Sequence, residues 1–414
     1  MTPNTLHFTL GGKAVSADSL SGFYAQLMQS AEFRSGDCAV TVSGDSQEAG
    51  SCRDLLAFLQ AYLTAKRRLS AKMEQINSTA PDDAESPDVC HLLGEFSRMN
   101  RGGKFIRGAL VTMGYALFAG QPADYSDDLA LAFELFQTAI LIHDDIIDHA
   151  KLRRSHVTIH ENYLAQWGQA GIARCPETAD TANSLALLAG DAGMYLANLR
   201  ICTAYADDPA LGRISAYFYR TALKTMYGET VDVALPFRGL HGIGGEEDIT
   251  GDVLQICRLK TAWYTLIGPL CLGALLAGCG ETQLHRLEAF AEALGIAFQI
   301  KDDILGVYGS TETGKDIGSD ISEFKQTLLY AYVRKTGRQY DELMRYYGKK
   351  SLSQSELAAV QEIFRQSGAL GYAEQTMNRY FDSARSLLAA MPDLPEERRA
   401  ELRGLVLFMD LRTK

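Results

Sequence analysis

Three aspartates close together give the first indication of chemistry in this sequence. They lie in the stretch "ILIHDDIIDHAKLRRS", where Asp144, Asp145 and Asp148 follow a run of apolar residues. Residues four apart share one face of a helix, so Asp144 and Asp148 would point the same way and repel each other. A hard cation such as Mg²⁺ would relieve this repulsion, because it prefers oxygen ligands and leaves room for substrate phosphates. Taken alone, the motif is also compatible with a solvated acidic helix end.

A second aspartate cluster favours the metal interpretation. In "FQIKDDILGVYG", Asp302 and Asp303 end another apolar helix. The segments "RLKTAWY" and "GKDIGSDISEFKQTLL" add three lysines, Lys260, Lys315 and Lys325. Carboxylates that bind Mg²⁺, together with Lys and Arg that bind phosphate oxygens directly, are the groups needed to hold a metal-bridged diphosphate.

The elements that must position these residues are almost all helices. Apolar residues recur at intervals of three and four from about residue 90 to the C-terminus, a pattern typical of amphipathic helices. Residues 127–148 can form one helix of about six turns, with Ser126 as its N-cap. The sequence therefore predicts a large all-α domain at residues 88–414.

The first part of the chain has a different pattern. "LHFTL" and "CAVTVSG" alternate in polarity like strands, and "SLSGFYAQLMQ" between them is typical of a short helix. Residues 1–75 are therefore expected to form a small α/β appendage, followed by the polar stretch 76–88. The segments "GGKAVSADSLSGF", "GDCAVTVSG" and "RDLLAFLQAYL" loosely resemble the C-terminal half of the sugar-transport phosphocarrier protein, and no phosphorylatable His lies in them. An appendage of unknown function is the favoured interpretation.

Composition restricts the class of protein. The net charge of −11 argues against non-specific nucleic-acid binding, which needs a basic surface. The eight cysteines are scattered without a C-x-x-C pair, which is typical of reduced thiols in a cytoplasmic protein. The start of the chain lacks a signal-peptide pattern. The longest apolar stretch, residues 265–279, is shorter than a membrane span, so we expect a buried helix there and no membrane span.

Five motifs in order resemble those of the trans-isoprenyl diphosphate synthases, also called polyprenyl synthetases. They are "RGGKFIRG", "HDDIIDHAKLRRS", "RLKTAWY", "FQIKDDILGVYG" and the lysine-containing segment that follows, and the match runs from about residue 90 to the C-terminus. The resemblance implies a helical bundle of the isoprenoid synthase type and a homodimer. It also implies head-to-tail condensation of isopentenyl diphosphate with an allylic prenyl diphosphate, assisted by about three Mg²⁺ ions per active site.

The resemblance assigns roles to individual residues. The metal ligands would be Asp144, Asp148 and Asp302. The allylic diphosphate and its reacting carbons would contact Arg153, Lys260, Thr261, Gln299 and Lys315. Isopentenyl diphosphate would be bound in a metal-free pocket by Lys104, Arg107, Gln137 and Arg154. Catalysis would depend on the three metal ligands together with Lys260 and Arg153.

The sequence departs from the family pattern in several places. Gly108 stands where the family usually has Pro, and Gly306 stands where many members have a third Asp in the second motif. Glu229 replaces a common Gln, and with Asp232 it would either line the site or form a polar contact in the core. Arg412 is close to the C-terminus, where a frayed tail is expected rather than a lid over the pocket.

Product length should depend on residues N-terminal to the first aspartate. In the family, a bulky residue five positions before that aspartate stops growth at farnesyl length. Ala139 takes this position here, with Ile140 next to it, so this floor is missing. Phe136 lies about one turn deeper and would stop growth at geranylgeranyl length. If Phe136 is an ordinary core residue instead, we expect a longer product and a floor on another helix, around Met194.

Two other functions are compatible with parts of the pattern. A class I terpene cyclase would need an N-S-E type second metal motif and would lack the isopentenyl diphosphate pocket. A non-catalytic partner subunit of a prenyl synthase would have lost metal ligands. The intact "GGKFIR" segment and the three predicted aspartate ligands favour the synthase.

Overall fold

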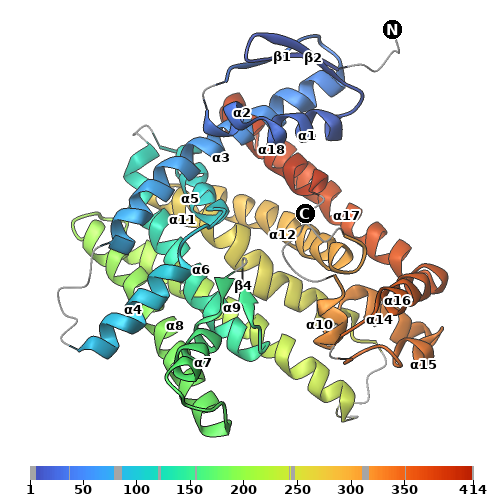
Figure 1. Cartoon of the computed structure of the whole chain (residues 1–414). Coiled ribbons are helices and arrows are strands. Elements are labelled where there is room, and N and C mark those ends of the chain that lie inside the picture. Colours follow the sequence, from blue (N-terminus) through green and yellow to red (C-terminus); the bar gives the residue numbers. More distant parts are fainter. Residues whose placement is uncertain are drawn as a thin grey trace.

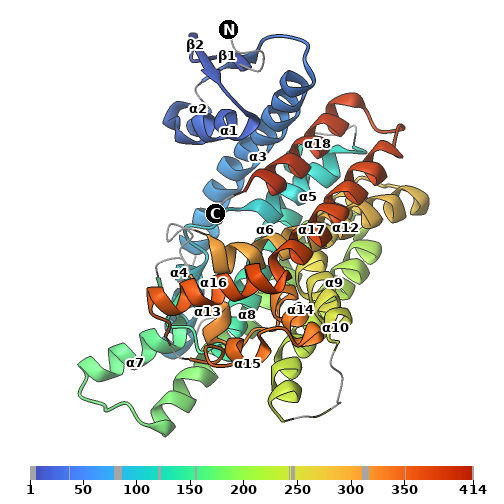
Figure 2. The same cartoon turned by 90° about the vertical axis from the view of Figure 1, so that its right-hand side faces the viewer.

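Helices dominate the structure, as the periodicity of the sequence predicts. The computed structural model describes residues 6–36, 38–78, 86–119, 123–153, 156–241, 243, 248–309, 317–349 and 351–412. The helices pack into a large bundle, and a small part that contains the N-terminal strands lies at one end of it (Figures 1 and 2). Within the described ranges, the strands of the main bundle are limited to one short hairpin. The predicted all-α main domain is confirmed.

The elements follow one another in a simple order. The N-terminal part consists of β1 (Leu6–Leu10), β2 (Lys13–Ala17), α1 (Leu20–Gln29), α2 (Ala31–Ser35) and β3 (Val40–Val42). The bundle begins with α3 (Gln47–Ser78), α4 (Pro87–Met99), α5 (Ile106–Ala116), η1 (Ala123–Ser126), α6 (Asp127–Ile147), β4 (Leu152–Arg153), β5 (His156–Val157), α7 (Ile159–Gln169), α8 (Pro176–Ala204) and α9 (Leu211–Leu240). It continues with α10 (Thr250–Ile256), η2 (Cys257–Ile267), α11 (Gly268–Leu276), α12 (Glu281–Tyr308), α13 (Ser319–Ser322), α14 (Leu328–Thr336), α15 (Tyr340–Leu343), α16 (Gln354–Ser367), α17 (Ala369–Ala389) and α18 (Glu396–Leu411).

The N-terminal part is a three-stranded antiparallel sheet with two short helices. Its strand order is β2-β1-β3, and Phe8 of the central strand pairs with Val15 and Val42. Phe8 is buried against Phe23 of α1, with ring centroids 4.7 Å apart in an edge-to-face arrangement. Both predicted strand segments and the helix between them are present. The predicted boundary at residue 75 lies near the C-terminal end of α3, so α3 connects the sheet to the bundle.

The helix α3 also joins the two ends of the chain, because it packs along the C-terminal helix α18. Arg403 of α18 makes two hydrogen bonds to the carboxylate of Asp54, at 2.8 and 2.9 Å. Next to this pair, a Cβ on Gly404 would collide with the backbone of α3, so the absence of a side chain lets the two helices touch. The N-terminal part and the C-terminal helix are therefore parts of one packed unit.

The helix that carries the first aspartate motif lies in the middle of the bundle. Most of α6 is buried, and its largest contact is with α8. The buried residues of α8 are small apart from Ile201: Ala182, Ala186, Ala189, Gly190, Gly193 and Ala197. Small residues let two helix axes come close together. The helix α12, which carries the second motif, packs between η2 and α17.

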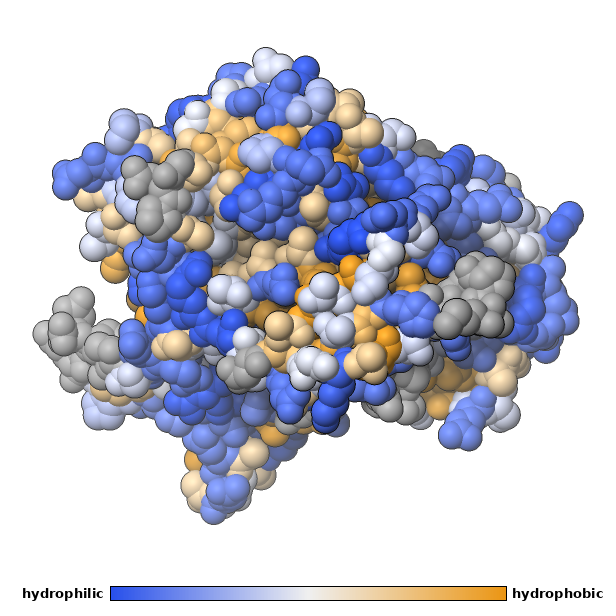
Figure 3. Space-filling view, turned by 90° about the horizontal axis from the view of Figure 1, so that it is seen from above, coloured by the Kyte–Doolittle hydropathy of each residue, from blue (hydrophilic) through white to orange (hydrophobic). Residues whose placement is uncertain are grey.

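The most apolar helical run is part of this core. Residues Thr250–Leu276, which span α10, η2 and α11, are long and apolar enough to cross a membrane by length and composition. However, 89% of the relevant window is buried inside the protein, so this run is a core helix, as predicted for the apolar stretch 265–279 that overlaps it. The eight cysteines all lie in the described part of the chain, and all are free thiols. The face seen from above is mostly hydrophilic, with hydrophobic side chains exposed near its middle (Figure 3).

The N-terminal end of α6 is fixed by a buried ion pair and not by the predicted cap. Ser126 makes no side-chain capping bond, and its hydroxyl donates to the carbonyl of Ala123 at 2.7 Å, so this prediction was wrong. Instead, the fully buried carboxylate of Asp127 accepts from Arg68 Nε at 2.8 Å and lies 2.9 Å from Lys72 Nζ. Both cations belong to α3. A negative charge in the first turn also interacts favourably with the helix dipole.

Asp127→Asn should destabilise the protein by about 2 kcal/mol, because charged hydrogen bonds to Arg68 are weakened in a buried place. Asp128→Asn is the matched control, since Asp128 is the next residue and its side chain is 45% exposed in a pair with Arg200. We expect the control to change stability by less than about 0.5 kcal/mol. Urea unfolding followed by circular dichroism measures both values, and equal effects would contradict the role given to Asp127.

Candidate active site

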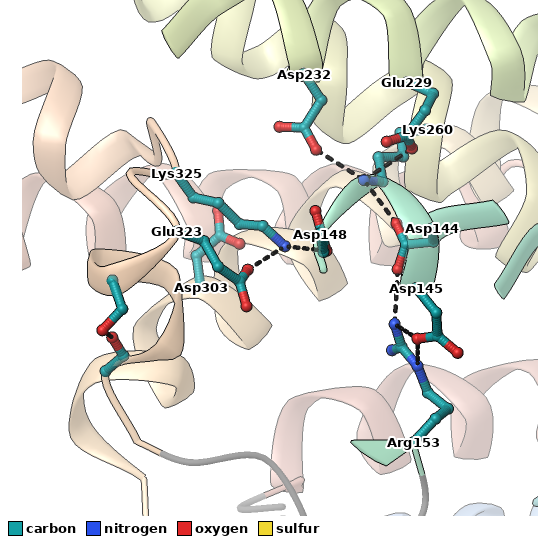
Figure 4. A network of polar contacts seen from close by, with 12 residues as sticks. Asp144, Asp145, Asp148, Arg153, Glu229, Asp232, Lys260, Asp303, Glu323 and Lys325 are labelled. Atoms are coloured by element: carbon teal, nitrogen blue, oxygen red, sulfur yellow. Dashed lines mark hydrogen bonds and ion pairs between the residues drawn. The ribbon is translucent and has the colours of Figure 1, made fainter. Parts of the chain in front are cut away.

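The first aspartate cluster lies where α6 ends (Figure 4). Asp148 is the C-cap residue, and its backbone N–H donates to the carbonyl of Asp144 at 2.8 Å, so the two residues are one turn apart as predicted. The next residue, His149, has a positive φ of 52°, which reverses the chain direction after the helix. The β4–β5 hairpin follows and brings Arg153 back to the helix end.

Arg153 bridges two carboxylates of this cluster. Its Nη2 donates to Asp144 Oδ2 at 2.9 Å, and its Nε donates to Asp145 Oδ1 at 2.6 Å. Burial raises the pKa of Asp145 to about 6, and the positive charge of Arg153 opposes this increase. Asp145, to which the sequence assigned no role, thus holds Arg153 beside the predicted metal ligand.

Lys260 lies among three carboxylates that come from two other helices. Its Nζ is 2.7 Å from Asp232, 2.8 Å from Glu229 and 3.3 Å from Asp144 (Figure 4). Burial disfavours the charged ammonium, but the three carboxylates outweigh burial and raise the pKa of Lys260 above its usual value. Glu229 and Asp232 therefore line the same cluster as Asp144.

Two backbone features bring Lys260 to this position. The segment η2 is a π-helix, a form that is rare in proteins and frequent at functional sites. In addition, a Cβ on Gly228 of α9 would collide with the backbone of Lys260, so α9 and η2 are in direct backbone contact. This contact places Glu229, the next residue, within reach of the ammonium group.

Lys325 approaches the same helix end from another side (Figure 4). Its Nζ lies 3.3 Å from Asp148 and 3.0 Å from Glu323. The backbone N–H of Lys325 donates to the carbonyl of Asp320 at 2.8 Å, which fixes the segment after α13. Burial opposes the charge of Lys325, but the surrounding carboxylates, first of all Asp148, raise its pKa well above the usual value. The sequence indicated Lys325 only as one of several nearby cations, because its partner is 177 residues away.

The two carboxylates of the second aspartate motif, those of Asp302 and Asp303, have different partners. Asp302 lies 3.1 Å from Arg412 Nη1, so the expected frayed tail is wrong for Arg412. Asp303 accepts from Gln299 Nε2 at 2.6 Å, and Gln299 accepts from the hydroxyl of Thr261 at 2.5 Å. Burial raises the pKa of Asp303 well above its usual value. The predicted residues Thr261 and Gln299 are therefore linked in one chain to the second motif.

Many family members have a third aspartate in this motif where this chain has Gly306, and here a carboxylate from another segment lies beside that position. A Cβ on Gly306 would lie 2.5 Å from Asp320 Oδ2, so the Asp320 carboxylate occupies the place next to Gly306. The backbone N–H of Gly318 also donates to the carbonyl of Gly306 at 2.9 Å, which holds the start of α13 against α12. A side chain at position 306 would collide with Asp320, so Asp320 can take its present position only because residue 306 is glycine.

Two of the residues predicted for the isopentenyl diphosphate pocket, Lys104 and Arg107, lie at the start of α5. Lys104 is exposed, and its carbonyl accepts from the hydroxyl of Tyr62 at 2.7 Å. Phe105, the N-cap of α5, has the left-handed conformation with φ 54°, which few non-glycine residues adopt without a structural or functional reason. The guanidinium of Arg107 lies 4.0 Å from the ring centroid of Tyr264 and donates to Thr265 at 2.9 Å.

The remaining predicted site residues divide into three groups. Gln137 is buried on α6. Phe136 and Ala139 are fully buried on the same helix, and Ile140 is half-buried. Arg154 and Lys315 lie outside the described residues.

Gly108, which replaces a common Pro, has a specific contact. Its backbone N–H donates to the buried carboxylate of Glu134 at 2.7 Å, a bond that Pro has no hydrogen to form. Glu134 belongs to α6, so this bond links the first turn of α5, beside Arg107, to the aspartate-bearing helix. The departure from the family pattern thus comes with a compensating interaction.

The carboxylates fit metal ions that also bind substrate. Within the part of the chain that the structure describes, no three His, Cys, Asp or Glu side chains are close enough to hold a metal ion by themselves. Mg²⁺ sites for phosphate-containing substrates are commonly built in this way, with one or two carboxylates completed by water and phosphate oxygens. Asp144, Asp148 and Asp302 are suitable donors for such sites.

Comparison with known proteins agrees with this geometry. The family model of the polyprenyl synthetases matches residues 92–364. The chain belongs to the polyprenyl synthetase family. It is 31% identical over 318 residues to the geranylfarnesyl diphosphate synthase of Aeropyrum pernix, covering 76% of this chain and 91% of that protein. It is 30% identical over 317 residues to a (2E,6E)-farnesyl diphosphate synthase of Mycobacterium tuberculosis, covering 75% of this chain and 80% of that protein.

A solved structure supports the same conclusion. The crystal structure of geranylgeranyl pyrophosphate synthase from Corynebacterium glutamicum, complexed with isoprenyl diphosphate and magnesium, is similar with a TM-score of 0.72 and 28% identity. The similarity covers 84% of this chain and 98% of that one. This polyprenyl synthetase is therefore a prenyltransferase of the isoprenoid synthase fold, as predicted. The names of its relatives differ in product length.

Proposed function

We propose that this polyprenyl synthetase joins isopentenyl diphosphate head-to-tail to an allylic prenyl diphosphate, with Mg²⁺ bound by Asp144, Asp148 and Asp302. One observation carries the proposal: carboxylates and cations from distant segments converge on the end of α6. Asp144 lies between Arg153 at 2.9 Å and Lys260 at 3.3 Å. A site with both kinds of group suits a polyanion bridged by metal ions better than a neutral ligand.

The magnesium requirement is supported by the donor set and by a relative. The crystallised Corynebacterium enzyme, 28% identical to this chain, is named as a complex with magnesium and isoprenyl diphosphate. When bound, Mg²⁺ would neutralise the negative charge that develops on the diphosphate as the allylic C–O bond breaks. We propose about three ions per site, as in the family.

The cations around the aspartates would bind the leaving diphosphate directly. Arg153, Lys260 and Lys325 each contact a carboxylate of α6 in this structure, and a diphosphate placed at the helix end would lie within their reach. They are fixed donors in a largely buried place, where electrostatic stabilisation is strongest. Lys315 is assigned to the same group from the family resemblance. Apolar side chains on the N-terminal side of Asp144 would keep water from the allylic cation.

The second substrate must not ionise, so its pocket should lack a metal. We propose Lys104, Arg107 and Arg154 as its diphosphate ligands, with Gln137 assisting. The ring of Tyr264 and the hydroxyl of Thr265 contact the guanidinium of Arg107 and hold it in place.

Replacement of a metal ligand should abolish turnover. Asp144→Ala, Asp148→Ala and Asp302→Ala should each reduce kcat by about a thousandfold or more, because several kcal/mol of transition-state stabilisation are lost. The helical circular dichroism spectrum should remain. Asp128→Ala, at the other end of α6, is the control and should retain activity. Activity of the unaltered enzyme should disappear with a chelator and return with Mg²⁺, and near-normal turnover of the Asp302 variant would refute its assignment.

The two diphosphate pockets should show separable defects. Lys104→Ala and Arg107→Ala should mainly raise KM for isopentenyl diphosphate, by about tenfold or more for a lost charged contact. Lys260→Ala and Arg153→Ala should mainly lower kcat and impair use of the allylic substrate. Initial rates with each substrate varied in turn measure both parameters. Equal effects of all four substitutions on both substrates would contradict two separate pockets.

We further propose that the enzyme is a homodimer that uses α8 and α9 as its interface. Large apolar side chains are exposed on both helices, Leu187, Leu188, Tyr195 and Leu199 on α8 and Leu223, Met226, Val233 and Phe237 on α9. Contiguous exposed apolar surface of this kind is rare in monomers. In a homodimer with twofold symmetry the same surface of each subunit covers the other.

If α8 and α9 form the interface, negative charges introduced on α8 should separate the subunits. Tyr195 and Leu199 are one turn apart on α8 and are 74% and 62% exposed. Tyr195→Asp combined with Leu199→Asp should convert the dimer to a folded monomer, as measured by light scattering after gel filtration. Val89→Asp, at a 45% exposed position on α4, should leave the dimer intact. A monomeric unaltered protein, or a dimeric double variant, would refute this interface.

A further inference from the structure

The contact between α6 and α8 is formed by two small residues at the level where product length should be decided. A Cβ on Gly193 of α8 would lie 3.1 Å from the Cβ of Ala139 of α6. One turn nearer to the aspartates, Gly190 of α8 accommodates the ring of His143 in the same way. Interiors are close-packed, so the space left by Ala139 and Gly193 has to be filled by another side chain or by product.

Phe96 of α4 fills part of this space. Its ring atoms Cε2 and Cζ lie so close to Gly193 that a Cβ there would collide with them. The ring and the methyl group of Ala139 thus meet at the same point on α8. Phe96 is 2% exposed and is among the largest fully buried side chains of the described residues. Only glycine at position 193 lets the ring come this close to α8.

The ring is held by a well-anchored helix. Glu95, the preceding residue, accepts from Arg98 at 2.6 Å and from Asn162 of α7 at 2.8 Å. Arg98 also donates to the carbonyl of Val157, in the hairpin that carries Arg153, at 2.9 Å. These bonds fix α4 against α7 and the hairpin, so the backbone that carries Phe96 is anchored.

We propose that Phe96 is the residue that ends chain growth in this enzyme. Ala139 occupies the position, five residues before Asp144, where a bulky side chain of α6 would otherwise block the product. Phe96 provides an aromatic ring beside the same position, from α4 instead of α6. This inference rests on the proposed function, because it concerns the length of the product made at that site.

Phe136, the floor expected from the sequence, has a different environment. Its ring packs against Phe133 at 5.6 Å and against Phe218 of α9 at 5.2 Å, measured between centroids. It lies on α6 one turn farther from the aspartates than Ala139, about 5 Å deeper. A growing chain that passes the level of Ala139 meets Phe96 first. Phe136 would limit growth only after the ring of Phe96 has been removed.

The test compares product lengths of three variants with one starter. Phe96→Ala should lengthen the main product by at least one isoprene unit, because an apolar cavity stays dry and accepts an apolar ligand. Phe136→Ala alone should leave the length unchanged. Phe364→Ala removes an equally buried ring in α16, outside the proposed site, and should also leave it unchanged. Unchanged length in an active Phe96→Ala enzyme, or lengthening by Phe136→Ala alone, would overturn the proposal.

A ring exchange makes the test specific. Phe96→Ala combined with Ala139→Phe moves the ring from α4 to α6 beside the same glycine. The double variant should return the product to the original length and should unfold at a higher temperature than Phe96→Ala. Persistence of the longer product would overturn the proposal. If Phe96→Ala does not fold, Phe96→Leu replaces it and should release a measurable fraction of longer product.

The readout separates this inference from the function on which it rests. If the unaltered enzyme makes no prenyl diphosphate from isopentenyl diphosphate, an allylic starter and Mg²⁺, the proposed function fails. If all variants turn over at normal rates and share one product length, the function stands and only the assignment of Phe96 fails.

Discussion

The concentration of negative charge at the end of α6 is the constraint on which the rest of the site depends. Three aspartates lie within about one turn there; Asp145 is buried, and Asp144 and Asp148 are largely so. Unpaired buried charges cost several kcal/mol each. Arg153, Lys260 and Lys325 compensate them, and each comes from a different segment. Three backbone features bring these cations to the helix end: the chain reversal at His149, the π-helical segment η2 and the segment after α13. Local backbone shape in three separate places therefore follows from one electrostatic requirement.

The helices and the two aspartate motifs could be predicted from the sequence, because both depend on short-range patterns. Periodicity of apolar residues determines where a helix can bury one face, and a four-residue spacing determines which carboxylates share it. Asp144 and Asp148 were placed correctly relative to each other for this reason. The expected cap at Ser126 failed because a tertiary contact, the pair of Arg68 with Asp127, fixes that helix end instead. Local capping preferences are weak compared with a buried ion pair.

Partners that are distant in sequence could not be predicted from one chain. Gly306 looked like the loss of a carboxylate, yet Asp320 fills the adjacent space. Gly108 looked like a local backbone change, yet its N–H group binds Glu134 on α6. At Gly306 and at Gly108, a group from another segment occupies the space or forms the bond that the usual family residue would have prevented. Such compensation depends on which surfaces meet in three dimensions, and no periodicity or spacing within a motif encodes it. The same limit applies to Phe96, which reaches Gly193 from a helix outside both motifs.

The C-terminal helix α18 connects the N-terminal part of the chain to the second aspartate motif. Phe408 of α18 packs against Phe58 of α3 at 5.1 Å and against Tyr24 of α1 at 6.0 Å between ring centroids. Four residues later, Arg412 lies 3.1 Å from Asp302. A metal ion and a guanidinium compete for the same carboxylate oxygens, so the proposed metal binding at Asp302 would require Arg412 to move or to share them. Because α18 is held by α1 and α3, the cost of that movement depends on the N-terminal part of the chain.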